Sequence, residues 1–124
     1  MYDYCSFTDL TGKTIVSIDG IENDHVVIKT ECGKTYGMKH FQDCCERVSL
    51  EGVLGNPSDV IGSPISYANS DTSDCSDTHD SGTRTTFTIQ TNGGSLVLIW
   101  EGYSNGYYGE GVSFYEDDRS GSRW

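Results

Sequence analysis

Short runs of β-branched and aliphatic residues, separated by polar turns, recur along the chain. They occupy residues 14–18, 25–30, 35–40, 47–53, 85–90 and 95–100. Runs of this length and composition, bounded by glycine, asparagine and aspartate, are typical of β-strands. Residues 95–100 are the most apolar run, which predicts a central strand. The pattern therefore predicts a mainly β, single antiparallel sheet domain, as a meander, a barrel-like sheet or a sandwich.

The segments between these runs have turn chemistry. Gly33 suits a tight turn between the runs 25–30 and 35–40, so the first three strands should form an antiparallel meander. Residues 57–62 begin with a proline and end with a glycine, which allows at most one short helix. A turn at residues 104–106 should lead into a final hairpin arm over residues 107–115.

Two polar segments are predicted to lie outside the sheet. Residues 69–82 read NSDTSDCSDTHDSG, with four aspartates, four serines and no aliphatic side chain. This composition predicts a flexible acidic loop. Residues 117–124 are also polar, and we expect this C-terminal tail to fray.

Length and charge narrow the function classes. The chain has 124 residues and a mass of 13.6 kDa, which suits a single domain spanning residues 1–124. Nineteen acidic residues against eight basic ones give a formal net charge of -11. A protein without a basic stripe is a poor direct ligand for nucleic-acid phosphates or an anionic membrane surface. The N-terminus shows no secretory pattern, and five cysteines cannot all pair internally. We therefore expect a cytoplasmic protein with free thiols.

The segment HFQDCCE, residues 40–46, concentrates an imidazole, two thiols and two carboxylates. One hypothesis is a thiol- or zinc-dependent enzyme centred on His40, Cys44 and Cys45. The neighbouring carboxylates argue against a reactive thiolate, because negative charge raises a thiol pKa. The weak zinc candidates are His40, Cys44, Cys75 and His79. The chain lacks a C-x₂-C knuckle, so packing is the favoured role and no cofactor is expected.

Residues 100–110 interleave tyrosine, tryptophan and glycine. Aromatic side chains give large contact areas at low entropic cost, so this segment could form a recognition surface, although ordinary cross-strand packing would give the same pattern. The predicted contact residues are Tyr103, Asn105, Tyr107, Tyr108 and Glu110, with Asp43 and Glu46 nearby.

Four segments together carry a resemblance to a known family. They are LTGK at residues 10–13, HFQDCCE at 40–46, IGSPI at 61–65 and SNGYY at 104–108. In this order they resemble a family of small uncharacterised proteins, with a domain of unknown function, that occurs mainly in bacteriophages and bacterial genomes. The resemblance covers about residues 10–116. It implies that residues 40–46 form a shared site or structural corner, and it implies no activity.

The preferred hypothesis is a protein-binding module. A small acidic domain of phage origin could inhibit a bacterial defence complex, as anti-CRISPR proteins do, by covering the basic channel of a nucleic-acid-handling effector. The alternatives are the zinc- or thiol-dependent enzyme and a structural phage component. The sequence does not indicate an oligomeric state.

Overall fold

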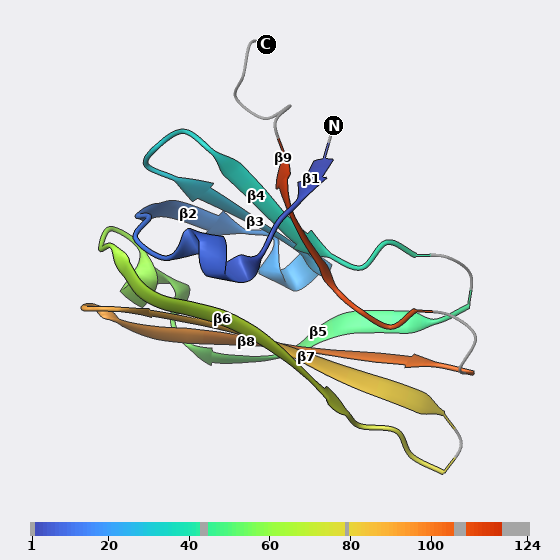
Figure 1. Ribbon diagram of the computed structural model, residues 1–124. Helices are drawn as coiled ribbons and strands as arrows, with labels where there is room; N and C mark the ends of the chain where they lie inside the picture. The colour runs from blue at the N-terminus through green and yellow to red at the C-terminus, as the bar shows by residue number, and fades with distance from the viewer. Residues whose placement is uncertain (1, 43–44, 79, 106–108, 118–124) are drawn as a thin grey trace.

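The strands of the computed structural model pack as two antiparallel sheets, face to face (Figure 1). The structure describes residues 2–42, 45–78, 80–105 and 109–117. Within them the only helical segments are three 3₁₀ turns, η1 (Phe7–Leu10), η2 (Ile21–Asn23) and η3 (Pro57–Val60). No helix in these ranges has the length and apolar character needed to cross a membrane.

The first sheet has five strands in the order β1-β9-β4-β3-β2. One side of it is the meander of β2 (Ile15–Asp19), β3 (His25–Thr30) and β4 (Thr35–Lys39), with β2 at the edge. The tight turn between β3 and β4 contains Gly33 with φ of 91°, a value that glycine adopts without strain. The last strand, β9 (Ser113–Asp117), pairs with β4 on one side and with β1 (Tyr2–Tyr4) on the other.

The second sheet has four strands in the order β5-β8-β7-β6. They are β5 (Arg47–Gly55), β6 (Ile65–Asp74), β7 (Ser81–Thr91) and β8 (Gly94–Ser104). The predicted central strand is confirmed, because β8 lies between β5 and β7. The mainly β antiparallel fold is likewise confirmed, and of the three predicted architectures the chain adopts the sandwich.

Two sequence predictions were wrong in detail. Residues 69–74 are not loop: they extend β6, which pairs with β7 in continuous register as far as Asp74 opposite Thr83. The chain after β8 does not return as a hairpin either, because β9 crosses to the other sheet. Residues 106–108 and 118–124, where parts of the predicted arm and tail fall, lie outside the described residues.

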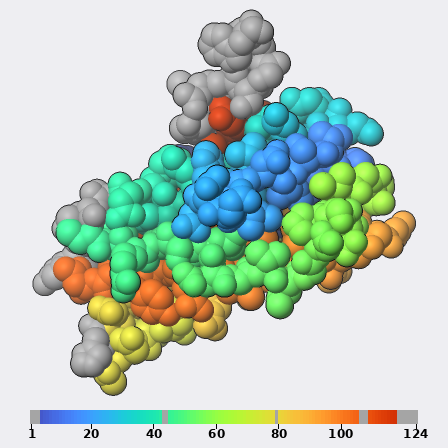
Figure 2. Space-filling view, turned by 180° about the vertical axis from the view of Figure 1, so that it is seen from behind, coloured from blue at the N-terminus to red at the C-terminus, as the bar shows by residue number. Residues whose placement is uncertain are grey.

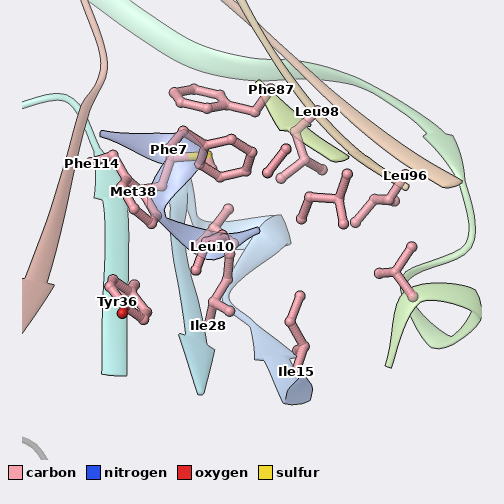
Figure 3. Close-up of a cluster of buried hydrophobic side chains, with 14 of the residues drawn as sticks. Phe7, Leu10, Ile15, Ile28, Tyr36, Met38, Phe87, Leu96, Leu98 and Phe114 are labelled. Carbon is pink, nitrogen blue, oxygen red and sulfur yellow. The ribbon is translucent and has the colours of Figure 1, made fainter. Parts of the chain in front are cut away.

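The core lies between the two sheets and is closed at one side by η1 (Figure 3). Phe7 from η1 packs edge-on against Phe87 of β7 and Phe114 of β9, with ring centroids 4.9 and 5.0 Å apart. Trp100 of β8 is fully buried, and its indole N–H points to the sulfur of Met38, at 3.2 Å, across the sandwich. These contacts fix the two sheets against each other and give the surface side chains a rigid support.

The outer face of the five-stranded sheet contains a pH-sensitive contact. His25 Nε2 lies 2.9 Å from the hydroxyl oxygen of Tyr115. Partial burial lowers the pKa of His25, Lys39 lowers it further, and Asp117 opposes the shift. The neutral imidazole is therefore favoured in the folded state. Its contribution to stability is present above the unfolded pKa of about 6.5 and is lost as the pH falls through the folded value.

We expect the urea midpoint of the wild type to fall between about pH 7 and pH 5 more steeply than that of a His25→Gln variant. Glutamine retains a hydrogen-bonding side chain but does not titrate. Urea melts of both proteins across this window measure the difference. Equal pH dependence in the two proteins would show that His25 does not contribute in this way.

Candidate functional site

His40 and Glu46 form a buried pair at one end of the sandwich. His40 Nδ1 lies 2.7 Å from the carbonyl oxygen of Gly111, and His40 Nε2 lies 2.6 Å from Glu46 Oε2. The side chains are 9% and 0% exposed. Because a carbonyl only accepts, Nδ1 must donate to Gly111, while Nε2 forms the hydrogen bond with the carboxylate of Glu46. The pair thus connects the β4–β5 segment to the segment that precedes β9.

This geometry bears on the enzyme and zinc hypotheses. Both ring nitrogens of His40 are engaged, so general-base or metal-ligand chemistry would require one of the two hydrogen bonds to break. Cys45 takes part in a disulfide bond and has no thiol proton to lose. Cys75 contacts the hydroxyl of Tyr103 at 3.8 Å. The residues that the structure describes contain no group of three potential metal ligands, while Cys44 and His79 fall outside them.

Glu110 is the second buried carboxylate at this end. It is 8% exposed and accepts hydrogen bonds from Ser104 Oγ and, at 2.8 Å, from Thr83 Oγ1. Burial alone would raise the pKa of Glu110, but hydrogen bonds from Ser104, Thr83 and Ser81 outweigh it and leave the pKa below its usual value. The carboxylate is therefore ionised and directed into the protein, where it anchors the segment before β9 to β7 and β8.

An open pocket of about 210 Å³ lies beside these carboxylates. Arg47, Asp80, Tyr103 and Asn105 are among the side chains that line it. The hydroxyl of Tyr103 donates to Glu101 Oε1 at 3.0 Å. The hydrogen bonds to Cys75 and Glu101 raise the pKa of Tyr103 to about 12, so it remains a neutral donor. Tyr103 is half-buried and Asn105 is exposed at this pocket.

The distal half of the β6–β7 hairpin borders this pocket, and we call it the acidic arm. It carries Asp71, Asp74, Asp77 and Asp80, and it lies at the lower edge of the molecule in Figure 1 and of the reverse face in Figure 2. Asp74 Oδ1 accepts from the backbone N–H and hydroxyl of Ser76 at 2.9 and 2.5 Å. The Ser76 hydrogen bonds lower the pKa of Asp74, which keeps it ionised at neutral pH.

Two arginines lie near the arm: Arg47 lines the neighbouring pocket together with Asp80, and Arg84 lies on β7. Arg84 is the only lysine or arginine in the chain between Arg47 and Arg119. Its guanidinium donates to Glu101 Oε2 at 2.8 Å, so its charge is already balanced. The four lysines of the chain all lie in or next to the five-stranded sheet. The two strands that form the arm therefore carry four aspartates in and between their distal halves, and Arg84 is their one basic residue.

The structure brings together only part of the predicted contact set. Tyr103 and Asn105 share the pocket, whereas Glu46 and Glu110 are buried beside it with inward-facing carboxylates. Asp43, Tyr107 and Tyr108 lie outside the described residues. Sequence reasoning missed Arg47. It identified the acidic character of residues 69–82 but predicted a flexible loop, whereas residues 69–74 belong to β6.

The fold is that of a small β-sandwich domain, and the acidic arm belongs to its four-stranded sheet. The chain belongs to a family described as a domain of unknown function (DUF7448), whose pattern matches residues 8–114. No curated protein and no solved structure matches the chain. This match confirms the expectation of a domain of unknown function, and it assigns no activity.

Proposed function

We propose that this domain is a protein-binding module whose acidic arm docks on the basic, nucleic-acid-binding surface of a host protein complex. The observation that carries the proposal is the set of aspartates on the arm, where the one arginine of the two strands is bound by Glu101. A phage-encoded inhibitor of a bacterial defence complex, of the anti-CRISPR kind, has this requirement. It must present negative charge to a groove built for phosphates.

The arm supports this role because three of its four carboxylates, those of Asp71, Asp74 and Asp77, accept local hydrogen bonds before binding. Asp77 Oδ1 accepts the backbone N–H of Asp80 at 2.7 Å, and Asp71 Oδ1 accepts that of Thr72 at 3.1 Å. The paired strands and these local hydrogen bonds restrict the carboxylate positions. The arm then loses less conformational entropy on binding than a flexible loop would. Fixed charge also guides the approach of a basic partner at low salt.

The neighbouring pocket supplies groups of a different kind. Tyr103 and Asn105 lie beside the arm and can add aromatic and amide contacts to the electrostatic ones. Interfaces commonly combine a few such anchors with a charged rim. In this proposal the arm determines the rate and the salt dependence of association, and the tyrosine and asparagine contribute to the lifetime of the complex.

The test is affinity capture from a bacterial lysate with the wild type and two neutralised variants. The arm variant replaces Asp71, Asp74, Asp77 and Asp80 with asparagine, which retains the oxygen that accepts each local hydrogen bond. The matched control carries Asp19→Asn, Glu22→Gln, Glu31→Gln and Glu51→Gln, four exposed positions away from the arm. Both variants lose four negative charges.

We expect the wild type to retain a nucleic-acid-handling protein at low salt and to release it as salt rises. The arm variant should bind it at least about tenfold more weakly, while the control stays within about threefold of the wild type. Equal weakening of both variants would mean that net charge acts without the arm. Retention of no nucleic-acid-handling protein by the wild type would contradict the proposal.

A further inference from the structure

A cleft of about 230 Å³ opens between the two sheets. Strands β6 and β7 lie on one side of it, and η1 and β9 lie on the other. One wall consists of hydroxyl-bearing side chains on β6 and β7, namely Ser70, Thr72 and Thr85. The other wall includes the edges of Phe7 and Phe114, from η1 and β9. Its lining contains no ionisable carboxylate, amine or guanidinium group. The cleft thus combines an apolar wall with an uncharged hydrogen-bonding wall.

Thr85 is the unusual residue of this cleft. It is 4% exposed, and its Oγ1 is the buried side-chain oxygen, among the described residues, for which the structure shows no hydrogen-bond partner. In the sheet register it lies between Thr72 of β6 and Trp100 of β8. A buried hydroxyl without a partner destabilises a protein, and valine has the same shape without the hydroxyl. The described residues therefore supply no hydrogen-bond partner for this hydroxyl, which lines the cleft.

The aromatic wall explains why the cleft stays open. Phe7 is fixed edge-on between Phe87 and Phe114, as Figure 3 shows, with interplanar angles of 64° and 79°. Rings locked in this way cannot rotate to fill the space next to Thr85. At the mouth, Ser70 and Thr72 are exposed, which gives a small molecule a polar entrance.

We infer that this cleft binds a small uncharged molecule with an apolar ring and a single hydroxyl or amide group. The ring occupies the space along Phe7 and Phe114, and the polar group pairs with Thr85 Oγ1. Charged molecules are excluded because the lining provides no counter-charge and the site is partly desolvated. This site is separate from the acidic arm, and it does not depend on the protein-binding proposal.

Three simple probes test the inference: phenol, toluene and benzoate. They share the ring and differ in having a hydroxyl, no polar group or a charge. In amide NMR spectra of the ¹⁵N-labelled protein, phenol should shift the signals of Ser70, Thr72, Thr85 and Phe114. We expect a dissociation constant near about 1 mM for phenol. Toluene should bind roughly fivefold more weakly, and benzoate should shift none of these signals.

The Thr85→Val variant gives the decisive comparison. Without phenol it should melt about 3–6 °C higher than the wild type, because the unpartnered hydroxyl is removed. The variant should also bind phenol and toluene equally, which abolishes the fivefold preference. Thr88→Val, on the opposite face of the same strand, is the control and should preserve that preference.

Two results would overturn the inference. One is phenol-induced shifts that are absent from the cleft residues, or present only elsewhere. The other is a Thr85→Val variant that retains the phenol preference. In either case Thr85 would not be the polar partner of a ligand. Because the NMR titration uses no protein partner, its outcome is independent of the capture experiment.

Discussion

Glu46→Ala is expected to lower the free energy of unfolding by about 3–5 kcal/mol, because it leaves the His40 imidazole facing an empty, buried site. The Glu46 side chain is fully buried and holds His40 Nε2 at 2.6 Å. A lone buried charge or unsatisfied ring nitrogen costs far more than the intact pair contributes. Urea denaturation of the wild type and the variant measures the difference.

A matched double variant separates the pair from the packing. His40→Phe combined with Glu46→Leu removes both polar partners and keeps most of the volume, so it should lose less stability than Glu46→Ala alone. If Glu46→Ala instead costs under about 1 kcal/mol, solvent enters the site freely and the pair does not hold the β4–β5 segment to the segment before β9.

Gly37→Ala should be the second strongly destabilising change, by about 2–4 kcal/mol. Gly37 of β4 lies opposite Tyr115 of β9. A Cβ atom at Gly37 would stand 2.2 Å from Cζ of Tyr115 and 2.3 Å from its hydroxyl oxygen. The Tyr115 ring cannot easily move, because the residue is 1% exposed, the ring contacts Phe41, and its hydroxyl is hydrogen-bonded to His25.

The control for Gly37 is Gly109→Ala, where an added Cβ has no neighbour within 4 Å. It should change stability by less than about 0.5 kcal/mol in the same chemical denaturation assay. Combining Gly37→Ala with Tyr115→Leu should recover part of the loss, because the smaller side chain makes room for the methyl group. Without any recovery, the cost would come from the backbone of β4 instead of the ring.

The local sequence pattern is sufficient to locate most strands, but it does not determine which strands pair with each other. The β2–β3–β4 meander follows from short apolar runs and tight turns, which are local properties. The pairing of β9 with β4 depends on Tyr115 covering Gly37, two residues far apart in sequence. Nothing in either segment alone indicates that contact, so the sequence pattern predicts a final hairpin arm instead.

The distal half of β6 shows a different limit. Its side chains are serine, threonine and aspartate, because one face forms the hydroxyl-bearing wall of the cleft and the other face is exposed to solvent. A strand without an apolar face has no hydrophobic alternation to detect, and its order comes from pairing with β7. Prediction from sequence is limited in the same way for Glu110. Its place in an aromatic and glycine-rich segment suggested a contact residue, but its hydroxyl partners on β7 and β8 are known only from the folded sheet.

The most direct test of the acidic-arm proposal is a competition measurement on the captured partner. A labelled oligonucleotide bound to that partner is titrated with the wild type, the arm variant or the matched control. The account predicts displacement by the wild type and the control, and at least about tenfold weaker displacement by the arm variant. A stable ternary complex that retains the oligonucleotide, or equal displacement by all three proteins, would contradict it.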